Sequence, residues 1–424
     1  MVKAMYRIII TCISAIAIVS NIVAQSLSMT ETRIFNSNFK TLQVHPANNE
    51  FAPPVIELNS DERLIISFDE LKSDRTYLRY RIVHCNADWQ PSQLIESEYI
   101  DGFNEGIIDD YAFSSATLTN YVNYRIVLPN NDIIFTTSGN YLVQIYPEDD
   151  PDDTLLQVRF YVVEPLMNIY GKVSAITDID ARRNHQQLEI MVENTDESIR
   201  NWTNDIQLRL TQNSRYDTEK VLSYPNLTEH NRAIYQHDRR LIFPAGNEFR
   251  RFEVVSTTYP GLNVSNIEYI HPYYHIDIMD DEPRSDKPYI YDQTQYGHYK
   301  VRQSGVNDSD SEADYIITHF SLYMPQQTSG NIYIDGDFTQ HNYSPINRMR
   351  YNSESGKYEI SLMLKMGSYN YQYLFVPDGL KVGQTSKIEG NHYATVNEYF
   401  ARVYYRPIGS RYDRLVGYTV LYSN

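Results

Sequence analysis

Residues 156–162 read Leu-Gln-Val-Arg-Phe-Tyr-Val, and this stretch shows the pattern that decides the fold class. Its apolar side chains alternate with Gln157, Arg159 and Tyr161. Because successive side chains of a β-strand point to opposite faces, the alternation predicts a strand with one buried face and one face in water. The same period of two recurs at 78–82, whereas sustained helical periodicity is almost absent from the chain.

The first part of the chain alternates between such strands and turns. Residues 122–128 form another alternating stretch, and Pro-Asn-Asn-Asp at 129–132 and Ser-Gly-Asn at 138–140 are turn-forming clusters. Several short strands with regular turn signals are typical of a sandwich. We therefore expect an immunoglobulin-like first domain over residues 30–165.

Two further groups of strands follow. Alternation at 188–193 begins a group that predicts a second β domain over residues 166–290. Residues 291–314 are expected to form a linker or long loop, because polar stretches interrupt the pattern there. A third immunoglobulin-like sandwich is expected over residues 315–424. The predicted fold is thus all-β, with two to three stacked sandwich domains after a signal peptide.

The first residues predict export. Lys3 and Arg7 precede a short apolar stretch, an order typical of a cleavable signal peptide, here over residues 1–24. The apolar stretch is shorter than the about 20 residues that a membrane-spanning helix needs, so we expect no membrane span in the mature chain. Cys12 would leave with the signal peptide. Cys85 would then be the one remaining cysteine, which excludes an internal disulfide.

Composition limits the class of partner. The formal net charge is −17 and the pI is about 5.1, which argues against nucleic acid, because phosphate binding requires clustered Lys and Arg. The chain has 38 Tyr but only 2 Trp. Tyr favours strands and also suits contact surfaces, and the composition leaves both explanations open.

Catalytic motifs are missing from the sequence. It contains no Gly-x-Ser-x-Gly elbow, no His-Glu-x-x-His, no Cys-x-x-Cys and no phosphate-binding glycine loop. This excludes only the enzymes that carry such motifs, since a glycosidase needs just two well-placed carboxylates. We expect a binding protein without catalytic residues or a cofactor.

The segment from His84 to Ser92 has two interpretations. His84, Cys85 and Asp88 are residue types that bind zinc. Adjacent residues on a strand point to opposite faces, however, so His84 and Cys85 would not converge on one ion. The alternative is the end of a strand followed by a turn, with Trp89 capping the sandwich core, and this is the interpretation we favour.

A second candidate lies further along the chain. Alternation would place His271, Tyr273, His275, Asp277 and Met279 on one side of a strand. Two histidines and one carboxylate on one face could hold a metal ion, but such a row is more commonly a solvated polar face.

A third candidate is the string Asp335-Gly336-Asp337-Phe338. Acidic residues around a glycine resemble part of a calcium loop, but the twelve-residue pattern is not completed. A turn between two strands is the explanation we expect.

Two strings in the first domain carry a family resemblance. His-Cys-Asn-Ala-Asp-Trp-Gln-Pro-Ser at 84–92 and Tyr-Ile-Asp-Gly-Phe-Asn-Glu at 99–105 resemble the plug proteins of the Bacteroidota type IX secretion system. That family was formerly catalogued as a domain of unknown function. Weaker similarity continues at 138–141, 159–165, 272–274, 281–284, 404–407 and 411–417.

The resemblance implies a periplasmic protein associated with the outer membrane. Its partner would be the large β-barrel translocon of that membrane, whose periplasmic opening it would seal when nothing is exported. The resemblance assigns no partner-binding residue. We expect Trp89, Tyr99 and Phe103 to determine the fold rather than to contact the pore.

The competing hypothesis is a periplasmic carbohydrate-binding protein. Residues 333–338 and 367–371 look somewhat like immunoglobulin-type glycogen-binding modules. Sugar platforms need exposed flat rings, preferably of Trp, and both Trp89 and Trp202 lie outside the third domain, although Tyr could substitute. An enzyme with an unrecognised carboxylate pair is a third possibility.

Overall fold

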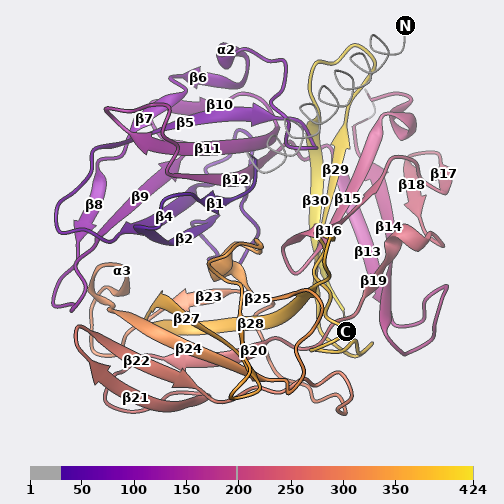
Figure 1. The fold of residues 1–424 in the computed structure, drawn as a ribbon. Helices are drawn as coiled ribbons and strands as arrows, with labels where there is room; N and C mark the ends of the chain where they lie inside the picture. The colour runs from indigo at the N-terminus through magenta and orange to yellow at the C-terminus, as the bar shows by residue number, and fades with distance from the viewer. Residues whose placement is uncertain (1–29, 197–198, 424) are drawn as a thin grey trace, which may run out of the picture.

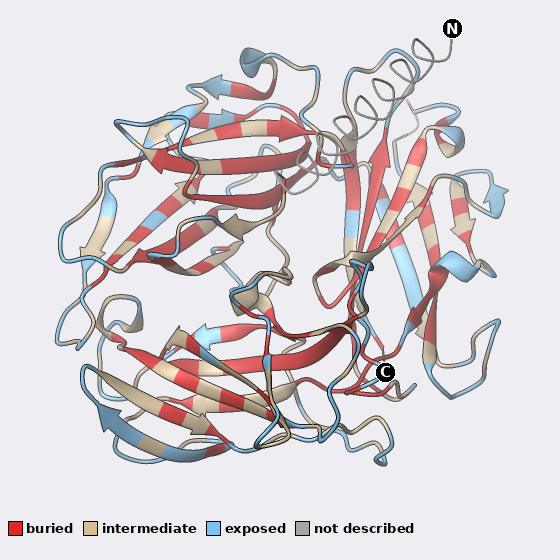
Figure 2. Cartoon of the chain, viewed as in Figure 1, coloured by how far each residue is buried: buried red, intermediate tan, exposed pale blue. Residues whose placement is uncertain are grey.

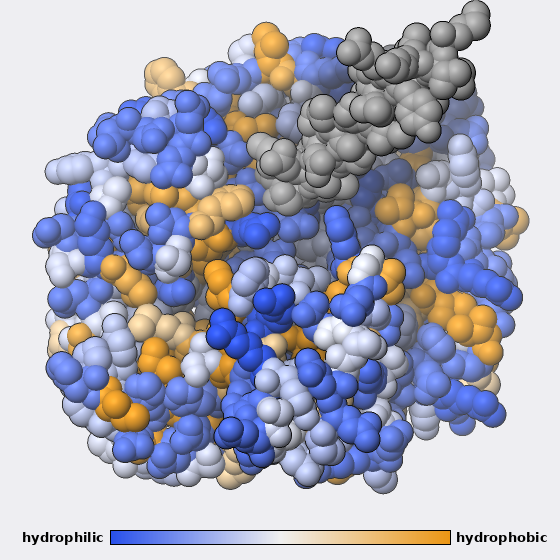
Figure 3. All heavy atoms as spheres, in the orientation of Figure 1, coloured by the Kyte–Doolittle hydropathy of each residue, from blue (hydrophilic) through white to orange (hydrophobic). Residues whose placement is uncertain are grey.

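The computed structural model of the protein describes residues 30–196 and 199–423, so the predicted signal peptide lies outside the described residues. The described residues form three β-sandwiches, which confirms the predicted all-β class (Figure 1). The first sandwich lies opposite the second in this view, and the third lies below both. Hydrophilic residues dominate the visible face, with apolar residues scattered among them (Figure 3).

The first sandwich contains β1 to β12. One sheet has the strand order β1-β12-β11-β5-β7, with β3 added to β12, and the other has the order β2-β4-β9-β8. A separate two-stranded sheet joins β6 and β10. The elements are β1 Arg33–Ile34, β2 Phe39–Pro46, β3 Val55–Glu57, β4 Leu64–Glu70, β5 Leu78–Cys85, α2 Glu96–Tyr99, β6 Ile100–Gly102, β7 Glu105–Ile107, β8 Asp110–Phe113, β9 Val122–Leu128, β10 Ile133–Phe135, β11 Gly139–Pro147 and β12 Leu156–Val163.

The second sandwich combines strands from two distant parts of the chain. Its sheets have the orders β13-β14-β18-β17, with β19 added to β14, and β16-β15-β29-β30. The elements are β13 Met167–Ser174, β14 His185–Asn194, η1 Trp202–Asn204, β15 Ile206–Gln212, β16 Arg215–Leu222, β17 Leu227–Glu229, β18 Arg232–Tyr235, η2 Arg239–Leu241, β19 Ile242–Pro244, β29 Glu398–Tyr405 and β30 Arg414–Tyr422.

The third sandwich packs a sheet of order β20-β28-β23, with β25 added to β28, against a sheet of order β21-β22-β24-β27-β26. The elements are β20 Arg250–Val254, β21 Val264–Ile270, β22 Tyr273–Ile278, β23 Tyr299–Val301, α3 Ser309–Glu312, β24 Tyr315–Tyr323, β25 Asn331–Asp335, η3 Asp337–Thr339, β26 Arg350–Asn352, β27 Lys357–Lys365 and β28 Gly367–Val376.

The strand pairing crosses the domain boundaries expected at 290 and 315. Residues of β15 pair with β29, from Ile206 with Tyr405 onward, so the last two strands complete the second sandwich and not a third domain at 315–424. The third sandwich is inserted between β19 and β29, and β20 to β22, expected in the domain at 166–290, pair with its strands. The expected linker at 291–314 contains β23 and α3. Period-two alternation identifies a strand but not its partner, which explains these differences.

Each sandwich buries its own apolar core between its two sheets (Figure 2). Strand β5 follows the predicted pattern, because Tyr80 and Ile82 are buried whereas Arg79 and Arg81 are half-exposed. Strand β12 does not follow it, since it is buried along its whole length. The predicted wet face of β12 is covered because it packs against the second sandwich.

Candidate functional site

A fourth apolar cluster lies between the first and second sandwiches and covers that face of β12. Tyr161 of β12 contacts Phe400 of β29 edge to face, with ring centroids 5.5 Å apart. Trp89 lies against Tyr161 at 5.2 Å and is 3% exposed. Leu142 and Leu415 join the cluster from β11 and β30. This first–second junction is therefore packed like a core, which disfavours independent motion of the two sandwiches.

Charged groups reinforce the first–second junction. The Arg402 guanidinium of β29 is fully buried and donates to Glu219 at 2.8 Å and to the Tyr161 hydroxyl at 2.5 Å. Glu219 also accepts from Arg209 at 2.7 Å, and both residues lie in the same sheet as Arg402, so the bond that crosses the junction is the one to Tyr161. The Arg159 guanidinium forms no ion pair with a carboxylate among the described residues, and its carbon lies 4.4 Å from the Trp89 ring. The carbonyl of Thr30, which accepts from Arg159 Nε, and the ring of Trp89 thus hold the cation that lacks an acid.

The strings that carry the family resemblance meet at this junction. The Ala87 amide donates to the Asp413 carboxylate at 2.9 Å, and the Asp413 amide donates to the side chain of Asn86 at 3.2 Å. The Tyr404 hydroxyl donates to Asn140 at 2.6 Å. The turn that makes these contacts places Trp89 in the left-handed region at φ 66°, which a bulky residue rarely adopts.

The first–third junction is organised around a buried ion pair. Lys365 Nζ of β27 lies 2.7 Å from Asp69 Oδ2 of β4, and both side chains are almost completely buried. The Tyr315 hydroxyl donates to the same Asp69 oxygen at 2.6 Å. The Tyr121 hydroxyl donates to the carbonyl of Ala313 at 2.8 Å, and its ring lies 4.1 Å from Lys365 Nζ. Since removal of one partner would leave a buried charge, this contact fixes how the two sandwiches meet.

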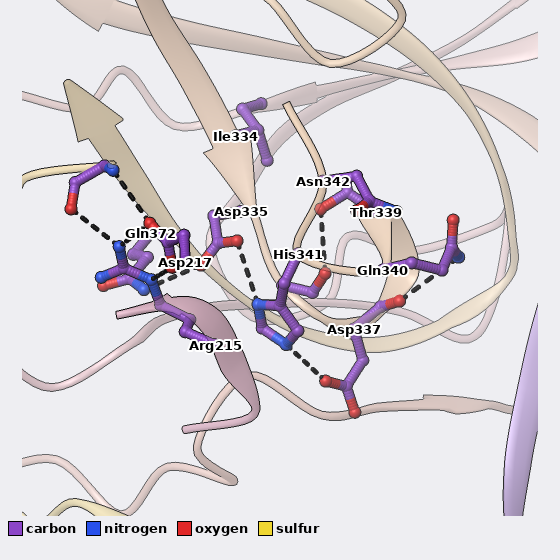
Figure 4. A network of polar contacts seen from close by, with 12 residues as sticks. Arg215, Asp217, Ile334, Asp335, Asp337, Thr339, Gln340, His341, Asn342 and Gln372 are labelled. Atoms are coloured by element: carbon purple, nitrogen blue, oxygen red, sulfur yellow. Dashed lines mark hydrogen bonds and ion pairs between the residues drawn. The ribbon is translucent and has the colours of Figure 1, made fainter. Parts of the chain in front are cut away.

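A histidine bridges two carboxylates beside this junction (Figure 4). His341 Nδ1 lies 3.0 Å from Asp335 Oδ1, and Nε2 lies 2.7 Å from Asp337 Oδ1. An imidazole donates from both nitrogens only when it is protonated. Burial alone would lower the pKa of His341, but the two carboxylates raise it to about 10. His341 is therefore a buried cation at neutral pH.

The network around His341 connects all three sandwiches. His298 contacts Asp337 and stacks on Phe51 of the first sandwich, with ring centroids 5.6 Å apart. On the other side, Figure 4 shows Asp335 beside Arg215 and Asp217, which come from β16 of the second sandwich. The Arg215 guanidinium bonds Asp217 at 2.6 Å and the carbonyl of Gly383, in the third sandwich, at 2.7 Å. The three pairwise junctions thus close a triangle.

The string Asp335-Gly336-Asp337 does not form an open cation site. As predicted, it follows a strand and leads into a turn, η3. Burial raises the pKa of Asp337, but His298 and His341 outweigh burial and hold that pKa well below its usual range. Its carboxylate is already neutralised by these imidazoles. Among the described residues, no three His, Cys, Asp or Glu side chains are grouped as metal ligands.

His84, Cys85 and Asp88 are not brought together. Both ring nitrogens of His84 have partners, Ser92 Oγ at 2.8 Å and the Ser138 carbonyl at 3.2 Å, and burial lowers its pKa to about 4. Cys85 belongs to the junction cluster, and burial raises the pKa of its thiol to about 12. Asp88 is exposed and accepts from the Gln90 amide at 3.1 Å.

The row from His271 to Met279 is only partly a strand face. His275 and Asp277 of β22 are half-exposed, whereas His271 precedes the strand in a turn. His275 Nδ1 lies 2.8 Å from Nε2 of His319 on the neighbouring strand β24, and Asp277 accepts from Asn266 at 3.1 Å. One histidine of the row, His275, thus forms a pair with a histidine outside it, His319.

Aromatic rings of the strings that resemble glycogen-binding modules are buried. Tyr333 is 9% exposed, and Tyr369 and Tyr371 are each 2% exposed. They lie in or beside the core of the third sandwich, so these rings form no flat surface for a sugar.

Trp89 and Tyr99 are buried, as expected for residues that determine the fold, at 3% and 5% exposure. Phe103 differs, since it is 73% exposed and packs in no core. The expectation that all three determine the fold is therefore wrong for Phe103. Its string continues past the end of β6, where the chain turns outward.

Sequence reasoning missed Arg402, Lys365 and His341. Arg402 offered a signal, because it stands alone in the otherwise apolar strand of residues 399–405. A lone charge in such a strand indicates a buried partner. Lys365 ends an alternating strand and His341 lies in a loop, so neither differs from a solvated residue in sequence.

The described helices are short, and none of them combines the length and apolar composition that a membrane crossing requires.

The chain is similar to known proteins in its first sandwich and along most of its length. Residues 39–164 match the family model described as type 9 secretion system plug protein 1st domain. The crystal structure of a hypothetical protein from Parabacteroides merdae is 44% identical, with a TM-score of 0.91, and the match covers 93% of this chain and 99% of that one.

A second solved structure matches far less well. It is the alkylpurine DNA glycosylase AlkC of Pseudomonas fluorescens bound to DNA containing an abasic site analog, at 13% identity over 32% of each chain. Its TM-score of 0.19 supports no argument about fold or function. No curated protein matches the chain.

Proposed function

Because this chain belongs to the type 9 secretion system plug protein family, we propose that it binds the periplasmic opening of the system's outer-membrane β-barrel translocon. It seals that opening when no substrate is being exported. On this proposal the protein is periplasmic, reaches its compartment by a cleavable signal peptide, and is associated with the outer membrane through its partner. It acts by contact and not by catalysis, and needs no cofactor.

The observation that carries the proposal is the family match together with the triangle of junctions. A plug must keep its shape against a pore, and three sandwiches that could swing apart would not do so. Lys365 of the third sandwich pairs with Asp69 of the first, and the Arg402 guanidinium of the second sandwich donates to the Tyr161 hydroxyl of the first. Both buried contacts cross a junction and oppose such motion. The Arg215 contact with Gly383 closes the remaining side.

The dimensions of the chain are sufficient for the role. A specific protein interface buries about 1,600 Å² in total, about half of it on each partner. The accessible surface of the chain is 21,032 Å², so a single face can supply that area.

Affinity purification from the native host tests the proposal. The chain carries a C-terminal tag, the outer membrane is solubilised gently, and the recovered proteins are quantified by mass spectrometry. Stoichiometric recovery of a very large outer-membrane β-barrel is expected. Recovery of the tagged chain without a barrel would contradict the proposal, and retention on a polysaccharide column would then favour sugar binding.

A further inference from the structure

We propose that one end of the molecule, formed by Ile95, Phe103, Ile134 and Ile408 and here called the end face, is the surface that docks on the translocon. The inference rests on the proposed function and adds to it the contact surface and the chemistry of the acceptor. The partner presents an apolar pocket with Lys or Arg side chains around it.

The centre of the end face is the two-stranded sheet of β6 and β10. Asp101 is paired with Ile134 and Ile100 with Phe135. Paired residues share a face, so Ile100 and Phe135 point into the core while Ile134 points out. The Phe103 amide continues the ladder by donating to the carbonyl of Asp132. Phe103 is therefore diagonal to Ile134 on the outer side, where long side chains on neighbouring strands are within reach of one another.

The loop between β29 and β30 extends the end face. Figure 1 shows this loop at the same end of the molecule as α2, β6 and β10. Arg411 of the loop forms an ion pair with Glu98 of α2, and Glu98 also accepts from the amide of Ile95 at 2.9 Å. Ile408, at the tip of the loop, is 100% exposed, and Ile95 is 65% exposed. Figure 3 shows apolar residues standing among hydrophilic ones at this end, over α2 and β6.

Unpaired acidic side chains surround these apolar residues. Glu96, Asp101 and Asp132 are exposed, and none of them forms an ion pair with another described residue. Exposed acidic residues without a basic partner also occur elsewhere in the described chain, such as Asp149 and Asp152, but at the end face they lie beside exposed apolar side chains. An apolar centre with an unneutralised acidic rim complements an apolar pocket with a basic rim, and such charge complementarity selects the partner and speeds association.

The exposed aromatic ring has the character of an interface anchor. Large rings near the centre of an interface often carry most of the binding energy. The same two-stranded sheet also has a face toward the core, where Phe135 is only 4% exposed. Phe103 instead lies on the outward face. It belongs to one of the two strings that resemble the plug family, whereas Trp89 and Tyr99 of these strings are buried.

Affinity purification of variants tests the inference. Phe103→Asp and Ile408→Asp each place a charge in the apolar centre, and recovery of the barrel per tagged chain is expected to fall at least about tenfold. The matched controls are Phe113→Asp, 51% exposed on β8, and Ile290→Asp, 78% exposed in the third sandwich. Both controls should recover the barrel as the unsubstituted chain does. Circular dichroism of all four purified variants verifies that each remains folded.

Photo-crosslinking provides a second readout, which reports whether position 103 lies against the barrel in the complex. A benzophenone side chain at position 103 should crosslink to the barrel, identified by mass spectrometry, and one at position 113 should not. If the unsubstituted chain recovers the barrel but Phe103→Asp and Ile408→Asp recover it equally, the inference is overturned and the proposed function stands. If even the unsubstituted chain recovers no barrel, both are overturned.

Discussion

The first sandwich meets its two neighbours through different chemistry. At the first–second junction the cations are arginines, held by Glu219 and by the rings of Trp89 and Tyr161. At the first–third junction a single lysine, Lys365, faces a single carboxylate, Asp69, with tyrosine hydroxyls around them. The difference teaches that the first–second junction keeps the acid of Arg402 within the second sandwich and is crossed by a hydroxyl and by ring contacts, whereas the first–third junction is crossed by a one-to-one ion pair.

The two junctions also differ in how they respond to pH. Arginine stays protonated throughout the accessible range, so the first–second junction keeps its charges. The first–third junction lies beside His298 and His341, which titrate. A change of pH should therefore alter the stability of the first–third junction more than that of the first–second junction, and substitutions can alter each junction separately. Unfolding measurements test both expectations.

The largest effect is expected from Lys365→Ala. The substitution leaves Asp69 buried with only Tyr315 and Asn123 as partners, and breaking one side of a buried ion pair costs about 3–5 kcal/mol in unfolding free energy. Differential scanning calorimetry at pH 7 measures the loss. The control is Lys172→Ala, in an exposed pair with Glu189, which should cost less than about 1 kcal/mol. Equal effects of the two variants would contradict the assignment of Lys365 to a structural junction.

A second test uses pH. The pKa of His341 is raised to about 10 in the folded chain, above its unfolded value of 6.5. Its contribution to stability is therefore complete below pH 6.5 and is lost as pH rises towards 10. Each pKa unit corresponds to about 1.4 kcal/mol. Because the interaction energy is shared between His341 and its partners Asp335 and Asp337, we expect a loss of stability on the order of 3 kcal/mol.

The matched variant for this test is His341→Gln, which keeps a side-chain donor but cannot titrate. Urea unfolding at pH 6 and pH 9.5 should show a stability difference that is larger for the unsubstituted chain than for the variant. Comparing the two chains removes the contribution of Tyr and Lys side chains that titrate in both. The same pH dependence in both chains would mean that His341 is not a buried cation.

At the first–second junction, Arg402→Met should cost less than Lys365→Ala, about 2 kcal/mol. Glu219 keeps its bond to Arg209 at 2.7 Å, so its carboxylate is not left without a cation. Calorimetry under the same conditions measures the change, and Arg402→Lys is expected to restore little, because an ammonium lacks the planar fork that reaches both Glu219 and Tyr161. A cost for Arg402→Met above that of Lys365→Ala would reverse the comparison between the junctions.

Much of the fold could be predicted from sequence. Alternation identified strands such as 78–82 and 122–128, because one face of each lies in a core and the other does not. The pairing of β15 with β29 could not be predicted, since partner choice depends on contacts between strands that are distant in the chain. For the same reason the covered face of β12 was expected to be wet.

The candidate site was less accessible to sequence reasoning. The family strings contribute side chains to the first–second junction and to the end face, but a string does not tell which of its side chains turn inward. Trp89 and Phe103 are both large aromatic residues in such strings, and one is 3% exposed whereas the other is 73% exposed. The direction of each is set by backbone geometry, by the left-handed turn at Trp89 and by the outward end of β6 at Phe103.

The smallest effect on stability is expected from Phe103→Ala. An exposed side chain that packs in no core should change the unfolding free energy by less than about 0.5 kcal/mol. Phe135→Ala, on the opposite face of the same two-stranded sheet and 4% exposed, should cost about 3–5 kcal/mol by opening a cavity in the first core. Calorimetry of the two variants separates surface from core with one residue type on one sheet. A cost above about 1 kcal/mol for Phe103→Ala would mean that Phe103 does stabilise the fold. A loss of barrel recovery by Phe103→Asp could then no longer be attributed to a lost contact with the barrel.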